Sequence, residues 1–286
     1  MKVVSWNVEN AARCMADLPA MAEQLGNPDV LCLQELRIRQ QDEEALRALT
    51  RALPGYRCQV SLARDARNVT FRGGRMYGVA TFARGAWRGN VPLWDREGRV
   101  VVVQRRGLAV VNVYAVNGTS KPWYDEEGRT RGDRHALKRR FQSQLMDLGR
   151  ELRRQGPVIM AGDWNVSRTA QDTHPRLRTE QPHARARAEL NARLAEDGFV
   201  DIWRERHAEE RAYTWFNRRS RTLDAARVDY ILVSDDLVPR VVAADILDLL
   251  PCSDHAPVRI ELAPRRSVRG RRETQGRGCG RNEPRA

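Results

Sequence analysis

The 286-residue sequence is poor in cysteine and has no long apolar run. Its five cysteines are scattered and none forms a C-x-x-C pair, so neither a disulfide framework nor a thiolate zinc site is indicated. No segment is long and apolar enough to span a bilayer, and the first residues enter a strand-like run without the pattern of a secretory signal. We therefore expect a protein of a reducing, cytoplasmic compartment with no membrane partner.

Negative charge is also in short supply. The chain has 50 Lys and Arg residues against 37 Asp and Glu residues, which gives a net charge of +13. The segment Arg265–Ala286 contains eight arginines and two glutamates, so it carries +6 and the preceding residues carry +7. A positive field attracts polyanions and speeds their encounter, which favours nucleic acid or a phosphorylated partner. A generally arginine-rich proteome would produce the same charge without any such partner.

Short apolar, β-branched runs alternate with amphipathic stretches, and this alternation predicts an α/β protein of layered sheets and outer helices. Several runs are apolar at nearly every position, which is typical of strands covered on both faces. The expected strands are Lys2–Trp6, Val30–Gln34, Tyr77–Phe82, Val100–Gln104, Leu108–Ala115, Val158–Ala161, Val228–Val233 and Val258–Leu262. Helices are expected over Cys14–Leu25 and His135–Arg154, each with an apolar stripe.

The hydrophobic content of 41% is enough for one large core, so we expect a single catalytic domain over residues 1–263. After Pro264 the composition changes to arginine and glycine with few apolar residues. Residues 264–286 are therefore expected to form a disordered tail.

Polar residues interrupt or follow the apolar runs at five places. These are Ser5-Trp6-Asn7, Leu33-Gln34-Glu35, Gly162-Asp163-Trp164-Asn165, Val228-Asp229-Tyr230 and Ser253-Asp254-His255-Ala256-Pro257-Val258. A carboxylate beside a core must be solvated, paired or bound to metal, because burying an isolated charge is costly. Five such segments predict a shared polar mouth at one end of the sheets. Oxygen-rich ligands without thiolates suit Mg²⁺, for which Mn²⁺ would substitute.

These segments, taken in order, resemble the signature of the endonuclease/exonuclease/phosphatase superfamily over residues 2 to 262. The segment Val111–Gly118 resembles the Tyr-x-x-Asn segment of the exonuclease III and apurinic/apyrimidinic (AP) endonuclease branch. Asp95–Val100 resembles the stretch that precedes this strand, and Gly74–Val79 resembles a loop that contacts DNA. The resemblance implies a four-layer αββα sandwich, with two packed mixed sheets flanked by helices and an active site at their edge.

The resemblance also implies a role for individual residues of this chain. Around the metal it places Glu35, Asn7, Asp254, Asp163 and Asn165, with Glu9 as an outer acid. Asp163 is expected to orient or deprotonate the attacking water, and Asn165 and Tyr114 to bind the scissile phosphate. His255, oriented by Asp229, is expected to stabilise the transition state. The expected substrate contacts are Asn117, Arg75, Tyr77, Trp215 and Arg227.

One segment departs from the AP endonuclease pattern. A bulky side chain just before the Arg-x-Asp segment helps to wall the abasic-sugar pocket in that branch, whereas this chain has Ala225-Ala226 before Arg227. We therefore expect a wider pocket and a relaxed specificity for abasic sites.

The sequence thus predicts a Mg²⁺-dependent DNA phosphodiesterase of DNA repair, acting as an AP endonuclease, a 3′→5′ exonuclease or both. Duplex DNA, including abasic duplexes, is the expected partner, and a monomer is the expected state. One alternative keeps the fold and changes the substrate to RNA, a phosphorylated lipid or a small molecule. The other is a non-catalytic nucleic-acid-binding protein. The Tyr-x-x-Asn segment and the charge of +13 oppose a small-molecule substrate, and the intact polar positions oppose loss of catalysis.

Overall fold

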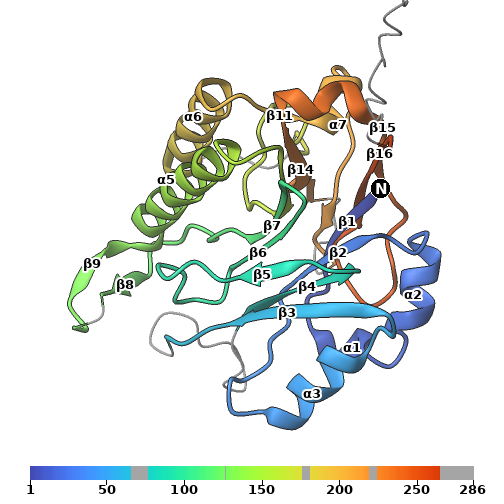
Figure 1. The fold of residues 1–286 in the computed structure, drawn as a ribbon. Coiled ribbons are helices and arrows are strands. Elements are labelled where there is room, and N and C mark those ends of the chain that lie inside the picture. The colour runs from blue at the N-terminus through green and yellow to red at the C-terminus, as the bar shows by residue number, and fades with distance from the viewer. Residues whose placement is uncertain (66–76, 126, 176–180, 219–223, 265–286) are drawn as a thin grey trace, which may run out of the picture.

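The computed structural model describes residues 1–65, 77–125, 127–175, 181–218 and 224–264. Two six-stranded mixed sheets pack face to face, and helices cover both outer faces (Figure 1). This arrangement confirms the predicted α/β sandwich. The division into a domain over residues 1–263 and a tail remains a prediction, and all but the first residue of that tail lies outside the described residues.

The first sheet has the strand order β15-β16-β1-β2-β4-β3. Its strands are β1 (Lys2–Asn7), β2 (Val30–Gln34), β3 (Tyr56–Leu62), β4 (Gly78–Arg84), β15 (Val241–Ile246) and β16 (Val258–Leu262). The second sheet has the order β11-β14-β10-β7-β6-β5. Its strands are β5 (Arg88–Asn90), β6 (Val100–Arg105), β7 (Leu108–Tyr114), β10 (Val158–Asp163), β11 (Phe199–Asp201) and β14 (Asp229–Ser234).

The helices lie on the outside of the two sheets. On the first sheet these are α1 (Ala11–Cys14), α2 (Leu18–Gln24) and α3 (Glu43–Arg51), and on the second α5 (Arg134–Arg153) and α6 (Gln181–Glu196). The short α7 (Ile202–Arg206) and the 3₁₀ helix η2 (Asp235–Arg240) lie near β14 and β15. Two small hairpins complete the fold, β8 (Pro122–Tyr124) with β9 (Thr130–Asp133) and β12 (Trp215–Phe216) with β13 (Ala225–Ala226). Among the described residues, none of these helices could cross a bilayer.

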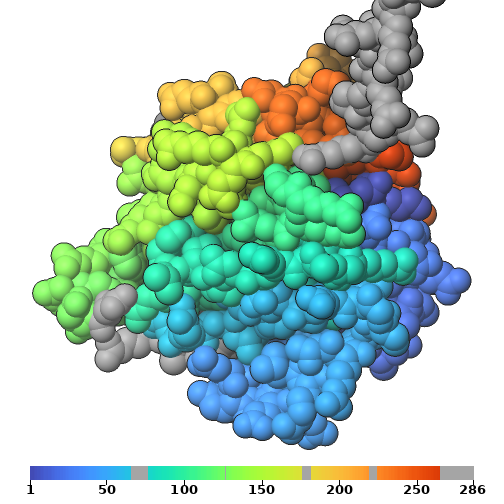
Figure 2. Space-filling view, viewed as in Figure 1, coloured from blue at the N-terminus to red at the C-terminus, as the bar shows by residue number. Residues whose placement is uncertain are grey.

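Alternation along the strands divides the apolar residues into three layers. In β1, Val3 faces the second sheet, whereas Val4 and Trp6 face the helices α1 to α3. In β10, Ile159 lies between the sheets and Met160 lies under α5 and α6. Strands covered on both faces are apolar at successive positions, which explains their sequence pattern. In the space-filling view the blue helical layer lies at the bottom and the yellow and orange helices lie at the top (Figure 2).

The eight predicted strands are all present, with ends that differ from the prediction by two residues at most. The prediction of one helix over Cys14–Leu25 was wrong, because the chain turns after α1 and a new helix begins at Leu18. Pro19 lies in the first turn of α2, where its missing N–H costs nothing, but it cannot continue a helix from the preceding turn. The other predicted helix is α5, which begins after Asp133 caps the N–H of Ala136.

Two parallel strand pairs set the position of the site. β1 runs parallel to β2, and β7 runs parallel to β10, so the carboxyl ends of these four strands meet at one edge of the sandwich. β14 is antiparallel to β10 and therefore brings its first residue, Asp229, to the same edge opposite Asp163.

Candidate active site

The edge where the strands end contains a cavity of about 730 Å³. Its walls include six of the predicted catalytic or metal-binding residues, namely Glu35, Tyr114, Asp163, Asn165, Asp254 and His255. Glu9, Tyr77, Asn117 and Trp215 also line it. Residues separated by more than two hundred positions in the sequence thus share one cavity.

Asn7 connects the carboxylates beneath this cavity. Its side-chain Nδ2 donates to Oε1 of Glu35 at 3.1 Å and to Oδ2 of Asp163 at 3.0 Å. The hydroxyl of Tyr114 donates to the same Oε1 of Glu35 at 2.8 Å. Because Asn7 is fully buried at the end of β1, its amide fixes the spacing between the two acidic side chains.

The other carboxylate oxygen of Glu35 forms an ion pair with an arginine. Arg37 donates to Oε2 of Glu35 through Nη2 at 2.7 Å and through Nε at 3.2 Å. This pair lies on a strained backbone, because Glu35 and Arg37 have φ angles of 56° and 54°. Glu9 (φ 56°) and Asn165 (φ 51°) share this left-handed conformation, so four of the six such non-glycine residues in the described chain line the cavity. Strain of this kind is concentrated at functional sites.

His255 and Asp229 form a buried pair. Nδ1 of His255 lies 2.8 Å from Oδ2 of Asp229. Burial disfavours the imidazolium, but the neighbouring Asp229 carboxylate outweighs it and raises the pKa of His255 to about 10. Ser253 holds the segment in place, since its hydroxyl accepts from the N–H of His255 at 3.0 Å and donates to the carbonyl of Asn7 at 2.5 Å. The ring is therefore oriented and positively charged at neutral pH.

Asp163 is the second buried acid of the site. Burial, followed by repulsion from Asp229, raises the pKa of its carboxyl from 3.8 to about 7. Its Oδ1 accepts the backbone N–H of Asn165 at 2.8 Å. The side chain of Asn165 is held in turn, because its Nδ2 donates to the carbonyl of Ala115 at 2.8 Å. A carboxyl with a pKa near neutrality is suited to accept a proton in the middle of the pH range.

Lys138 is a functional residue that the sequence reasoning missed. Its side chain is 1% exposed on α5, lines the cavity, and donates through Nζ to the carbonyl of Asn165 at 2.6 Å. Burial lowers the pKa of this amine from 10.5 to about 8. A signal was present in the sequence, because Lys138 precedes Phe141 by three positions and Leu145 by seven, which places a cation on the buried side of the helix.

The polar residues can hold a hard cation. A carboxylate oxygen of Asp163, one of Asp229 and a ring nitrogen of His255 lie within 4.8 Å of one another, and the two carboxylates can act as ligands while His255 carries its proton. Oδ1 of Asp229 is buried and has no hydrogen-bond partner among the described residues. The amide of Asn7 contacts two carboxylates, Glu35 and Asp163, and Asp229 lies close to Asp163, so a divalent cation would offset the repulsion between these acids. Oxygen donors without thiolates fit a hard metal ion.

Three of the five predicted substrate-contacting residues line the catalytic cavity. Tyr77, Asn117 and Trp215 line the cavity, and Nε1 of Trp215 donates to Oδ2 of Asp254 at 3.3 Å. Arg75 lies outside the described residues.

The prediction that Arg227 contacts the substrate requires correction. Arg227 is 1% exposed and does not line the cavity. Its guanidinium is held by Asp172 and Asp201, with a shortest distance of 2.6 Å to each. Two buried carboxylates use the donors that a substrate phosphate would need, so Arg227 is a structural ion-pair residue.

This fold and this set of side chains are those of the Endonuclease/Exonuclease/phosphatase family. The chain belongs to that family, since the family profile matches residues 4–255. Nucleases of this family depend on metal ions, in agreement with the acidic cluster. The chain is 27% identical over 275 residues to an exodeoxyribonuclease of Bacillus subtilis (strain 168), covering 91% of this chain and 98% of that protein.

Two solved structures are similar along nearly their whole length. The 3′-5′ exonuclease NExo from Neisseria meningitidis is 28% identical, with a TM-score of 0.72, covering 92% of this chain and 99% of that one. A variant of the 3′ phosphatase NExo from Neisseria, bound to a product DNA hairpin, is 27% identical, with a TM-score of 0.72 and the same coverage of both chains.

Proposed function

We propose that this chain is a Mg²⁺-dependent DNA phosphodiesterase of DNA repair, of the exonuclease III and AP endonuclease type. Its substrate is duplex DNA with an abasic site or a 3′ end, and the protein acts as a monomer. The observation that carries the proposal is the buried network in which one amide, Asn7, bridges Glu35 and Asp163 beside the His255–Asp229 pair. The similarity to an exodeoxyribonuclease and to a 3′ phosphatase bound to a product DNA hairpin supports DNA as the substrate.

The geometry supports a different catalytic role for each of these residues. Hydrolysis of a phosphodiester needs an in-line nucleophile and neutralisation of the charge that grows on the phosphate oxygens. Asp163, with a pKa near 7, orients an attacking water and accepts its proton. The imidazolium of His255 donates to a phosphate oxygen, and Asp229 keeps that ring charged and in place. Tyr114 and Asn165 hold the scissile phosphate, with Asn117 beside them.

Glu35, supported by Asn7, Asp254 and the oxygens of Asp163 and Asn165, would hold Mg²⁺ or Mn²⁺. When bound, the metal supplies positive charge that lowers the barrier to attack on the phosphate. Arg37 and Tyr114 fix the two oxygens of Glu35, so the carboxylate is oriented before a metal arrives.

The shape of the cavity supports a relaxed substrate choice. Trp215, Ala226 and Val228 form one wall, and the small side chain of Ala226 leaves space where a bulky one would close the pocket. We therefore propose that ordinary 3′ nucleotides and 3′ phosphates enter this cavity together with abasic sugars.

The test uses end-labelled duplexes, one intact and one with a single stable abasic analogue, incubated with protein and Mg²⁺. We expect metal-dependent cleavage that EDTA and Asp163→Asn abolish. Asp245→Asn is the matched control, because Asp245 pairs with Arg259 at 2.8 Å away from the cavity and its loss should leave activity intact. Cleavage 5′ of the analogue indicates AP endonuclease activity, and a ladder from the 3′ end indicates exonuclease activity. A folded wild-type protein that cuts neither duplex would refute the proposal.

A further inference from the structure

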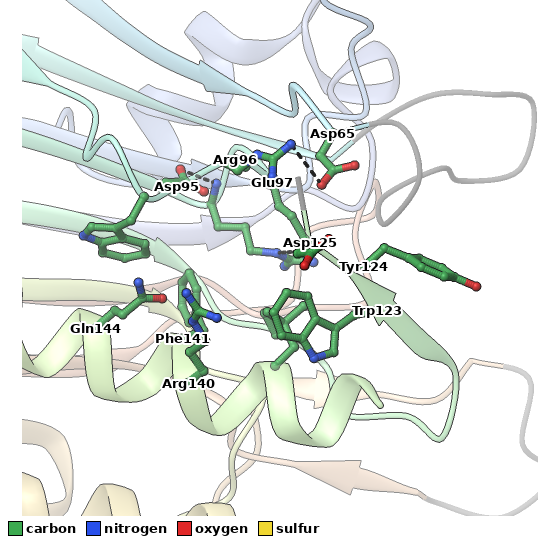
Figure 3. A pocket seen from close by; sticks show the side chains of 14 residues that line it. Asp65, Asp95, Arg96, Glu97, Trp123, Tyr124, Asp125, Arg140, Phe141 and Gln144 are labelled. Atoms are coloured by element: carbon green, nitrogen blue, oxygen red, sulfur yellow. Dashed lines mark hydrogen bonds and ion pairs between the residues drawn. The ribbon is translucent and has the colours of Figure 1, made fainter. Parts of the chain in front are cut away.

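A second cavity, of about 210 Å³, has a lining distinct from that of the catalytic cavity, and Figure 3 shows the residues that line it. We call it the aromatic cleft, after Trp94, Trp123, Tyr124 and Phe141 in its lining. It is bounded by the first turns of α5, by the β8–β9 hairpin, and by residues 94–99. The two cavities share a wall, because Val116 lines the aromatic cleft and the next residue, Asn117, lines the catalytic cavity.

The aromatic rings are held by neighbours and present partly exposed surface. The guanidinium carbon of Arg140 lies 5.6 Å from the centre of the Trp123 ring, and Trp94 packs edge-to-face against Phe141 at 5.6 Å. In Figure 3, Trp123, Arg140 and Phe141 lie on the α5 side, and Asp95, Arg96 and Glu97 lie across the opening. Rings arranged in this way offer a flat ligand an apolar surface.

The carboxylates of the cleft are already used by the protein. Asp95 accepts the N–H groups of Arg99 and Val100 at 2.8 Å each. The remaining ion pairs are Glu97 with Arg99 and Arg134, Asp125 with Arg129 and Arg131, and Asp65 with Arg96. Three of these acids are therefore paired with arginines, and Asp95 is held by backbone N–H groups, which reduces their repulsion of a negatively charged ligand at the aromatic rings.

Two donors at the cleft are not used by the protein. Nε1 of Trp123 is buried and has no hydrogen-bond partner among the described residues. Arg140 contacts the Trp123 ring but forms no ion pair within the described part of the chain, and its side chain is exposed. An unsatisfied buried donor points to a ligand with a carbonyl acceptor, and an unpaired arginine beside an aromatic ring is suited to a phosphate.

We propose that the aromatic cleft binds an unpaired nucleotide of the DNA substrate, with the base against the aromatic rings and the phosphate at Arg140. This inference rests on the proposed function, since it assigns a second contact to the same strand that enters the catalytic cavity. Stacking on aromatic side chains accepts any base, because every base has a flat π face. Single-stranded DNA fits these features better than duplex DNA, whose bases are covered by their neighbours.

The position of Arg99 brings the two cavities into contact. Its guanidinium lines the aromatic cleft and lies 4.7 Å from the centre of the Tyr114 ring, while the Tyr114 hydroxyl contacts Glu35. Two side chains, Arg99 and Tyr114, therefore separate a nucleotide in the aromatic cleft from the carboxylate of Glu35. A strand that leaves a duplex near the catalytic cavity can reach the cleft without a large change in the protein.

The test measures binding to a blunt duplex, to the same duplex with a short single-stranded extension at either end, and to a short single-stranded oligonucleotide. Measurements are made in EDTA, so that no strand is cut. We expect the wild type to bind the extended duplex more tightly than the blunt duplex. Trp123→Ala should lower the affinity for the extended duplex and for the oligonucleotide roughly tenfold. Affinity for the blunt duplex should stay within about twofold of the wild type.

The variant Arg140→Ala distinguishes a direct contact between Arg140 and a phosphate from the nonspecific attraction of a positively charged protein for DNA. It should weaken binding of the oligonucleotide and reduce the slope of log affinity against log salt by about 0.7, the value for one contact with a single strand. Arg139→Ala is the matched control, because it removes the same charge from the next position of α5, where Arg139 pairs with Glu189 at 3.2 Å. Trp123→Phe keeps an aromatic ring but removes the Nε1 donor, so it guards against loss of folding in the alanine variant and should bind more tightly than Trp123→Ala but less tightly than the wild type.

Equal affinity of wild type, Trp123→Ala and Arg140→Ala for the oligonucleotide would overturn the aromatic cleft as a binding site. Equal losses in Arg140→Ala and Arg139→Ala would overturn the phosphate contact. Because binding is measured without cleavage, these outcomes are independent of the proposed catalytic function. Cleavage of duplex DNA with no effect of the cleft variants would leave that function standing and refute this inference alone.

Discussion

Nδ1 of His255 lies 2.8 Å from Oδ2 of Asp229, and both side chains are buried where β14 and the segment before β16 meet. Asp229 begins β14 of the second sheet, and His255 lies three residues before β16 of the first sheet, so the packing of the two sheets helps to fix the orientation of the imidazole. The same contact controls its charge, because the Asp229 carboxylate overcomes the burial of the ring and raises its pKa to about 10.

The first prediction follows from this pair. Asp229→Asn should lower kcat by roughly 10²- to 10⁴-fold, because the imidazolium loses the carboxylate that keeps it charged and oriented. The alkaline fall in activity, expected near pH 10 in the wild type, should move to lower pH in the variant. The measurement is kcat against pH. Asp245→Asn, which changes an acid away from the cavity, should keep the wild-type profile.

Stability gives an independent measurement of the same contact. The pKa of His255 is raised above its unfolded value of 6.5, so its contribution is complete below pH 6.5 and is lost as pH rises through about 10. Asp229→Asn should therefore reduce the melting temperature most at pH 6 and least above pH 10. A loss of stability that does not depend on pH would mean that the pair does not control the charge of His255.

Much of the fold and the site could be predicted because both depend on local patterns. Strands covered on both faces produce apolar runs, and polar residues at the ends of those runs must meet at the edge of the sheets. Asn7, Glu35 and Asp163 were found in this way, whereas Tyr114 was found through the resemblance of its segment to the Tyr-x-x-Asn segment. The order of these segments along the chain was sufficient to locate the site, because parallel pairing of two strands brings their carboxyl ends to the same edge of the sheet.

The remaining features depend on contacts that no local pattern contains. Arg227 is held by Asp172 and Asp201, which are 55 and 26 positions away in the sequence, so its removal from the substrate site could not be deduced from its neighbours. β3, β15, α3 and α6 were not predicted. β15, for example, is buried at only alternate or irregular positions, and an edge strand of this kind has little periodic signal.

The second prediction concerns the metal. Glu35→Gln should raise the Mg²⁺ concentration needed for half-maximal activity by at least about tenfold, because a neutral amide binds a hard cation more weakly than a carboxylate. Glu9→Gln is the matched control. Glu9 also lines the cavity, but its carboxylate faces Arg13 at 3.1 Å, and its replacement should change the requirement by less than about threefold.

A readout without catalysis supports this assignment. A ligand that binds only the folded protein raises its melting temperature, so Mg²⁺ should stabilise the wild type and Glu9→Gln but have little effect on Glu35→Gln. Equal stabilisation of all three proteins would show that Glu35 does not hold the metal.

The third prediction concerns Lys138, whose Nζ lies 2.6 Å from the carbonyl of Asn165. Lys138→Met should lower kcat by roughly tenfold with little change in KM, because Asn165 loses the contact that supports its strained backbone next to Asp163. Arg139→Met, which removes a half-buried cation of the same helix that pairs with Glu189 away from the cavity, should retain wild-type activity.

The pH dependence of stability distinguishes this lysine from an ordinary surface cation. Its pKa is lowered from 10.5 to about 8, so the folded protein carries the cost of a buried charge below pH 8. This cost disappears as pH rises from about 8 towards 10.5, because the amine then loses its proton in the folded state first. The stability of wild type relative to Lys138→Met should therefore increase over that range. A constant difference would contradict the burial of a charged amine.

The fourth prediction concerns the width of the catalytic cavity. Ala226 pairs with Trp215 across the β12–β13 hairpin, and both residues line the cavity beside Val228. Ala226→Leu should narrow the space available to a nucleotide, and should slow removal of ordinary 3′ nucleotides by roughly tenfold. Cleavage at an abasic analogue should fall by less than about threefold, because a sugar without a base needs less room.

Val228→Ala is the opposite change, since a smaller side chain in the same wall widens the cavity. It should increase the rate of removal of ordinary 3′ nucleotides relative to the rate of cleavage at an abasic analogue. The measurement is the ratio of the two rates for each protein on matched duplexes, with the melting temperature as a check on folding. A fall of both rates by the same factor in Ala226→Leu would mean that this position does not sort substrates by size. A ratio that moves in opposite directions in the two variants would show that the small side chain at Ala226 sets the breadth of substrate choice.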